Sequence, residues 1–150
     1  MPQKKNVYAV VPIKDVLFYI NRKRSNVVKK RLGRNPLLFY GKNVNTTGPK
    51  IRSFVDNGCD CSSCGLPGAY FKIERSIHAN QEYYLSLYGI RNGKEVEFTV
   101  DHTVARCLGG ANSLENTSTM CFRCNNKKAQ IENETVSALR LLTTKQLREN

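Results

Sequence analysis

Two stretches with one spacing, Cys61-Ser62-Ser63-Cys64 and Cys121-Phe122-Arg123-Cys124, are the strongest structural signals in this chain. A C-x-x-C turn presents two thiolates to one metal ion, and two such turns complete a closed four-cysteine zinc site. The zinc in such a site holds the fold and leaves no open position for chemistry. The alternatives are paired disulfides, a redox dithiol, and a ligand set with Cys59 in place of Cys61. Cys107 is expected to be a packing or bystander thiol.

The chain between these two turns predicts a β-sheet. Aromatic and β-branched residues, which are typical of strands, gather at residues 69–74, 83–90 and 95–100. Asn92-Gly93 is a strong signal for a two-residue turn. We therefore expect the last two strands to form a hairpin whose second strand runs into Asp101-His102.

A short strand at residues 116–120 and a helix from Cys124 to about residue 131 are expected next. The side chains expected on the exposed face of this helix are Lys127 and Lys128. Further along, Thr143 with Gln146 resembles a capping box, which predicts a separate last turn of helix.

The first third of the chain predicts a strand at residues 8–13 and a helix at residues 15–32 that stops at Gly33. The apolar side chains expected to face inward from this helix are Val16, Ile20, Val27 and Val28. Turn-forming residues gather at 41–50 and predict a linker. We therefore expect a basic N-terminal segment at residues 1–50 and a second domain at residues 51–150.

Positive charge is concentrated in the same first third. The net charge is +12, and residues 1–56 contain 13 of the 24 Lys and Arg residues but only two of the 12 acidic residues. Because Lys and Arg release condensed counterions when they bind phosphates, this clustering predicts a nucleic-acid partner rather than a merely solvated surface. The residues expected to contact phosphates are Arg22, Lys23, Arg24, Lys29, Lys30, Arg31 and Arg34.

Polar residues that can perform chemistry lie between and beside the cysteines. The candidates are Asp101, His102, Asn116 and Asn125. A zinc that ties the two C-x-x-C turns together would bring the strand of Asp101-His102 against the helix that carries Asn125. Hydrolysis of a phosphodiester needs a base to activate water and a cation to polarise the phosphate. A histidine beside the oxygen ligands Asp101 and Asn125, which suit magnesium, supplies both.

Together these motifs resemble the HNH, or ββα-metal, endonuclease family over roughly residues 57–130. The residues that carry the resemblance are Cys61-x-x-Cys64, Phe98-Thr-Val-Asp101-His102, Gly109-Gly110, Leu114-Glu115-Asn116 and Met120-Cys121-Phe-Arg-Cys124-Asn125-Asn-Lys127-Lys128. The chain is most similar to small phage-type, homing-like HNH proteins. The resemblance implies an α+β fold, with a ββα-metal nuclease unit stapled by zinc, an extra β-hairpin and the basic, helix-containing N-terminal segment.

The resemblance also implies a role for each candidate residue. His102 would be the general base, Asp101 and Asn125 would hold a catalytic magnesium ion, and Asn116 would brace the loop and orient the base, with Asn112 as the alternative. Asn125 stands where many family members have histidine, so the chain is an H-N-N variant. An amide oxygen is a harder ligand than imidazole and disfavours zinc or nickel at that position. Lys127 and Lys128 are further expected phosphate contacts.

The expected function is therefore a DNA endonuclease that depends on structural zinc and catalytic magnesium, with a homodimer left open. The alternative is a non-catalytic zinc-dependent nucleic-acid-binding module, which would not need the set of Asp101, His102 and Asn125. The composition is that of a globular protein, and no apolar run approaches the roughly 18 residues of a membrane span. We expect no secretory signal and a cytoplasmic location, or the interior of the host cell for a phage-encoded protein, because the cysteine usage fits a reducing interior.

Overall fold

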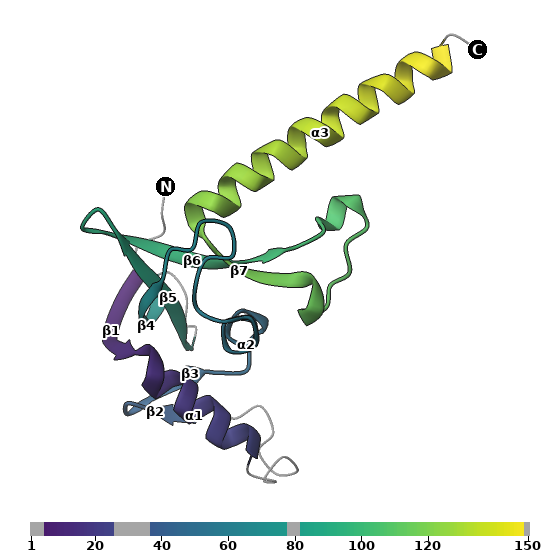
Figure 1. Cartoon of the computed structure of the whole chain (residues 1–150). Coiled ribbons are helices and arrows are strands. Elements are labelled where there is room, and N and C mark those ends of the chain that lie inside the picture. Colours follow the sequence, from purple (N-terminus) through teal and green to yellow (C-terminus); the bar gives the residue numbers. More distant parts are fainter. Residues whose placement is uncertain (1–4, 26–36, 78–81, 149–150) are drawn as a thin grey trace.

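The fold of the chain is mixed α and β (Figure 1). The computed structural model describes residues 5–25, 37–77 and 82–148, without the side chains of residues 22–25, 37–39 and 145–148. An α+β fold was expected from the sequence, and the structure confirms it. Within the described ranges, no helix combines the length and the apolar character that crossing a membrane requires.

The seven strands of the sheet are β1 (Lys5–Pro12), β2 (Leu37–Phe39), β3 (Lys42–Asn45), β4 (Gly68–Ser76), β5 (Tyr83–Arg91), β6 (Lys94–His102) and β7 (Thr117–Cys121). The sheet branches at β5. On one edge β5 pairs with β4, which pairs with β1, and on the other edge it pairs with both β3 and β6. All pairs are antiparallel except β3 with β5, which is parallel.

The hairpin of β5 and β6 confirms the turn signal in the sequence. Asn92 and Gly93 have φ angles of 52° and 72°, the left-handed region that two-residue hairpin turns require. The pairing of β6 with β5 ends at Glu97, and from Phe98 onward β6 pairs with β7 instead. The second strand of the hairpin runs into Asp101 and His102, as predicted.

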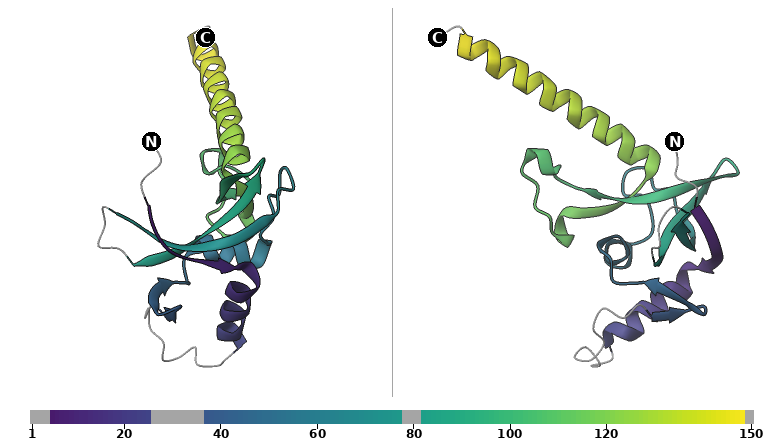
Figure 2. Two further views of the ribbon diagram at one scale, coloured as in Figure 1. Left: turned by 90° about the vertical axis from the view of Figure 1, so that its left-hand side faces the viewer. Right: turned by 180° about the vertical axis from the view of Figure 1, so that it is seen from behind.

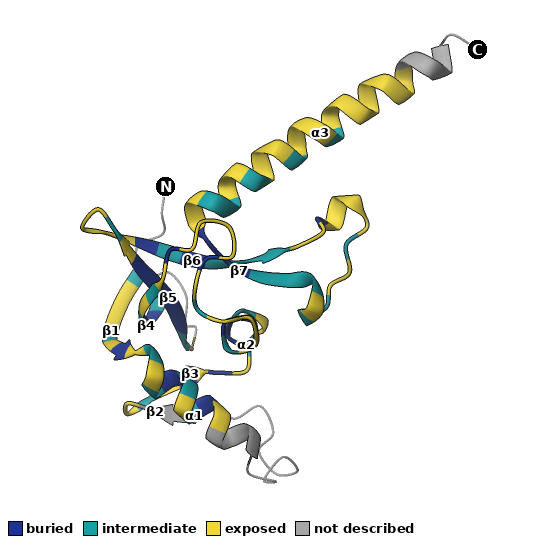
Figure 3. Cartoon of the chain, viewed as in Figure 1, coloured by how far each residue is buried: buried dark blue, intermediate teal, exposed yellow. Residues whose placement is uncertain are grey.

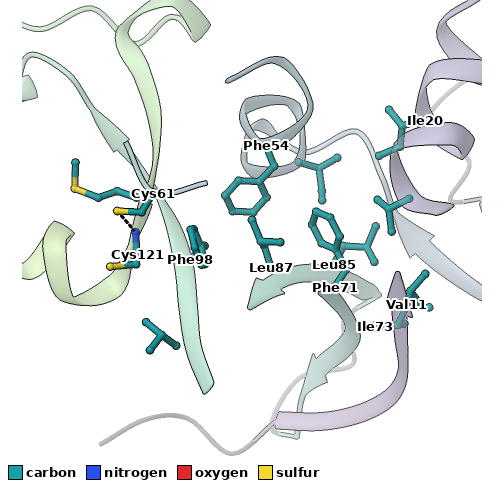
Figure 4. Packing of buried hydrophobic residues seen from close by; sticks show 14 of the residues in the cluster. Val11, Ile20, Phe54, Cys61, Phe71, Ile73, Leu85, Leu87, Phe98 and Cys121 are labelled. Carbon is teal, nitrogen blue, oxygen red and sulfur yellow. Dashed lines mark hydrogen bonds between the residues drawn. The ribbon is translucent and has the colours of Figure 1, made fainter. Parts of the chain in front are cut away.

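Helix α2 (Pro49–Asn57) packs against β6 and β7 (Figure 1). Its fully buried Phe54 packs on Phe71 of β4, with 6.1 Å between the ring centroids (Figure 4).

The linker predicted at residues 41–50 is wrong. Gly41 and the preceding Tyr40 form the turn of the β2–β3 hairpin, and Val44 of β3 is completely buried, so this segment belongs to the core.

The N-terminal elements contribute to the same core. The predicted strand and helix are present as β1 and α1 (Ile13–Ser25), and Val16 and Ile20 of α1 are buried as expected. Val27, Val28 and Gly33 lie outside the described residues. The fully buried side chains around Phe54 come from β1, β3, β4, β5 and β6 and include Val11, Val44, Phe71, Ile73, Leu85, Leu87 and Phe98.

One long helix, α3 (Phe122–Arg148), ends the chain and projects away from the sheet (Figure 2). The separate last turn predicted at Thr143 is wrong. The hydroxyl of Thr143 donates to the carbonyl of Leu139 at 3.0 Å, one turn back in the same helix, so Thr143 caps nothing. Beyond its first turns the helix is almost wholly exposed (Figure 3).

Candidate functional site

The four cysteines of the two C-x-x-C turns form one cluster. The Sγ atoms of Cys61, Cys64, Cys121 and Cys124 all lie within 4.8 Å of one another. A tetrahedral zinc with bonds of about 2.3 Å needs sulfur atoms roughly 3.8 Å apart, and the Sγ atoms of Cys64 and Cys121 are 3.9 Å apart. The cluster joins the turn before β4 to the end of β7 and the first turn of α3. These four thiols can therefore bind a zinc ion.

The surroundings of the cluster favour thiolates at its open side. The backbone of Leu66, with the side chains of Cys61 and Arg91, lowers the pKa of the Cys64 thiol to about 6. The guanidinium Nη2 of Arg91 lies 2.8 Å from Cys64 Sγ. Burial raises the pKa of Cys121 to about 12, so this thiol needs a metal ion to lose its proton near neutral pH.

The other two cysteines lie outside the cluster. The Sγ of Cys59 is 3.7 Å from the carbonyl oxygen of Phe54, and burial raises the pKa of this thiol to about 11. The structure therefore favours Cys61 over Cys59 as a ligand. Cys107 is exposed, as a bystander thiol would be, and all six cysteines are free rather than paired in disulfides.

Helix α3 contacts the end of β6 through two side chains. The Nδ2 of Asn125 donates to Thr99 Oγ1 at 2.8 Å, and Lys128 Nζ contacts both the carboxylate of Asp101 and the carbonyl of His102. Thr99 and Asp101 are two residues apart on one strand and so face the same side of it. The first turns of α3 thus fix the strand end that carries Asp101 and His102.

The two candidate asparagines of the loop between β6 and β7 have different contacts. The amide of Asn116 accepts from the backbone N–H of Val104 at 2.9 Å and donates to the carbonyls of Val104 and Ala111. Asn112 instead contacts His102, with its Oδ1 3.3 Å from His102 Nε2. Asn116 braces the loop, and Asn112 is the asparagine that touches His102.

His102 and Asn125 line a groove of about 800 Å³. Asp101 is not among the lining residues, because Lys128 covers its carboxylate. Thr99 and Lys128 both support the candidate site. Our interpretation of the sequence missed Thr99 and assigned Lys128 to phosphate binding instead. Their signal is spacing, since Thr99 is two residues before Asp101 and Lys128 is one turn after Asn125. The lining residues are Pro49, Lys50, Arg52, Thr99, Val100, His102, Asn112, Ser113, Leu114, Thr117 and Asn125.

The residues expected to contact phosphates differ in their exposure and in how far the structure describes them. Lys127 is exposed, as predicted, whereas the exposure predicted for Lys128 is wrong because its ammonium is drawn to Asp101 and to backbone carbonyls. For three of the N-terminal basic residues only the helical backbone is described: Arg22, Lys23 and Arg24. Four others lie outside the described residues: Lys29, Lys30, Arg31 and Arg34.

Removing the ammonium of Lys128 should destabilise the protein. We expect Lys128→Met to lower the free energy of unfolding by about 1–3 kcal/mol, because the Asp101 side chain is only 13% exposed and would lose its ion partner. Urea denaturation measures this change. The matched control, Lys127→Met, removes an exposed lysine and should change the stability by less than about 0.5 kcal/mol. Equal stabilities of the two variants would contradict the assigned role of Lys128.

Comparison with known proteins finds a match for the part of the chain that contains His102 and Asn125. Residues 89–130 match the family model described as HNH endonuclease. Over these residues the chain is similar to the HNH endonuclease family, and this match confirms the family resemblance seen in the sequence. No curated protein and no solved structure matches the chain significantly. The matched stretch includes Asp101, His102, Asn116 and Asn125 and the second C-x-x-C turn, whereas Cys61 and Cys64 precede it.

Proposed function

We propose that the protein is a metal-dependent endonuclease that hydrolyses DNA phosphodiester bonds, with His102 as its general base. The observation that carries the proposal is the placement of His102 and Asn125 on one groove, within the residues that match the HNH endonuclease model. Asp101 precedes His102 at the end of the same strand. A module that only binds nucleic acid has no use for this arrangement.

Asp101 and Asn125 carry oxygen atoms that suit a magnesium ion, which would have to replace the ammonium of Lys128 at the Asp101 carboxylate. Carboxylate and amide oxygens are ligands that magnesium accepts, and it takes few protein ligands because it keeps several waters. With its Nδ2 bound to Thr99, the amide of Asn125 offers Oδ1 as its acceptor atom. When bound, the cation would polarise the phosphate and stabilise the departing oxygen. We propose the four-cysteine cluster as a separate, purely structural zinc site.

Asn112 supports the proposed role of His102, because its Oδ1 lies 3.3 Å from Nε2 and can accept a hydrogen bond from it. In our proposal Nε2 donates to Asn112, which leaves Nδ1 as the basic nitrogen. Nδ1 takes a proton from water, and the resulting hydroxide attacks phosphorus in line with the leaving 3′ oxygen. The bond from phosphorus to that oxygen breaks and the oxygen takes a proton from a solvent water, which leaves 5′-phosphate and 3′-hydroxyl ends, as the family resemblance implies.

Cleavage of supercoiled plasmid tests this proposal. The zinc-loaded protein should nick or linearise the plasmid in the presence of magnesium and leave it intact without a divalent cation. Binding of DNA without cleavage at any divalent cation tested would reject the endonuclease and favour the nucleic-acid-binding module.

We further propose that the basic N-terminal residues increase the affinity for DNA. Deleting residues 1–50 would remove the buried Val11, Val16 and Val44 and unfold the core, so neutral substitutions are the better test. The triple variant Lys29→Gln, Lys30→Gln and Arg31→Gln should bind DNA more weakly, and the slope of log affinity against log salt should fall by about 0.9 for each phosphate that the variant no longer neutralises. Fluorescence anisotropy over a salt titration measures this slope. An unchanged slope would contradict the proposal.

A further inference from the structure

The groove beside His102 has a second wall, which helix α2 supplies. Lys50 and Arg52 of α2 line the groove together with His102 and Asn125. No acidic residue lines it in the part of the chain that the structure describes. A groove bordered by cations and free of carboxylates suits an anionic ligand. Helix α2 lies outside the residues that match the HNH endonuclease model.

The two cations of α2 differ in what they contact. Lys50 Nζ lies 3.2 Å from a carboxylate oxygen of Glu97, so much of its charge is compensated within the protein. Arg52 is exposed, and among the described residues the structure gives its guanidinium no ion pair. Arg52 therefore keeps its charge available for a ligand in the groove.

The position of Arg52 is set by the packing of its helix. Its neighbours Ile51 and Phe54 are buried in the core, which holds α2 in place. The hydroxyl of Ser53 lies 3.2 Å from that of Thr117, and Thr117 is paired with His102 across the β6–β7 ladder. Arg52 and His102, which both line the groove, are thus attached to one packed unit.

We propose that Arg52 binds a backbone phosphate of the nucleic-acid strand in the groove, so that α2 forms the substrate-binding wall opposite His102. The ligand in this inference, a nucleic-acid strand, rests on the proposed nuclease function. A guanidinium presents parallel N–H donors that match two phosphate oxygens, which a lysine ammonium does not reproduce. Arg52 is therefore a binding residue that positions the strand relative to the base.

The test compares Arg52→Met with Arg140→Met, which removes the same charge from an exposed position on α3 away from the groove. Anisotropy of a fluorescent DNA duplex, without magnesium, measures affinity across a salt titration. We expect Arg52→Met to weaken binding about tenfold and to lower the salt slope by about 1, while Arg140→Met keeps the native slope. Arg52→Lys should keep the slope but not the full affinity. Thermal melts should show that all three variants are folded.

The outcomes separate this inference from the nuclease proposal. If the native protein cleaves DNA and Arg52→Met binds with native affinity and slope, only the role of Arg52 is wrong. If Arg52→Met lowers the slope but the native protein cleaves nothing, phosphate binding by Arg52 is supported and the nuclease proposal fails. Equal losses of affinity in Arg52→Met and Arg140→Met would also overturn the inference, because they would show a general charge effect.

Discussion

Replacing His102 by alanine should lower the rate of magnesium-dependent DNA cleavage by about 10² to 10⁴-fold, the usual contribution of a general base. The side chain lines the groove, and its Nε2 contacts Asn112, so the substitution removes Nδ1 as proton acceptor without touching the cysteine cluster. Single-turnover cleavage of a labelled duplex measures the chemical step directly. DNA affinity and zinc content should stay native, because neither depends on the imidazole.

A matched variant, Asn112→Ala, separates the base from its support. It removes only the partner of Nε2, so we expect a smaller loss of rate than in His102→Ala, with the same native DNA affinity. Cleavage by His102→Ala at the native rate would show that another group activates the water. Loss of DNA binding together with cleavage would show that His102 acts in binding and not as a base.

Loss of the metal from the cysteine cluster should unfold the protein. Structural zinc sites contribute roughly 10–16 kcal/mol of apparent binding free energy near neutral pH, which equals or exceeds the whole stability of a typical domain, about 5–15 kcal/mol. Cys61 and Cys121 are buried within the hydrophobic core, so the cluster and the core form one cooperative unit. We therefore expect Cys121→Ser to abolish the cooperative thermal transition, as removal of zinc by a strong chelator should.

Circular dichroism melts combined with metal analysis measure this effect. The chain contains its own control, because Cys107 is exposed and lies outside the cluster. Cys107→Ser should keep one zinc per chain and a native melting temperature. A Cys121→Ser protein that melts like the native one would show that the cluster does not hold the fold.

The features that could be predicted from the sequence have local causes. The β5–β6 hairpin follows from Asn92-Gly93, which adopts the turn whatever surrounds it. The cysteine cluster follows from ligand spacing, because two C-x-x-C turns together supply the four ligands of one zinc ion. The alternation that ends β6 at Asp101-His102 is equally local.

The features that the sequence could not predict depend on partners far along the chain. The position of α2 rests on Phe54 packing against Phe71 and on the parallel pairing of β3 with β5, and neither leaves a local pattern. The ion pair between Lys128 and Asp101 could not be predicted either, because the sequence does not show which lysine pairs with a carboxylate far along the chain. The capping box predicted at Thr143 was wrong for another reason, because a threonine can either cap a helix or donate a hydrogen bond to a carbonyl within it.

The first turns of α3 carry three residues with different roles. Cys124 belongs to the cysteine cluster, Asn125 is a candidate metal ligand, and Lys128 contacts the end of β6. Since each residue turns a helix by about 100°, inserting or deleting one residue between Cys124 and Lys128 would rotate the following groups out of phase with β6. Between Cys124 and Lys128, Asn126 and Lys127 can therefore accept substitutions, but the stretch can accept no change in length. Among the described side chains of α3, none after Glu132 belongs to the candidate site, so truncations or fusions there should leave the groove intact.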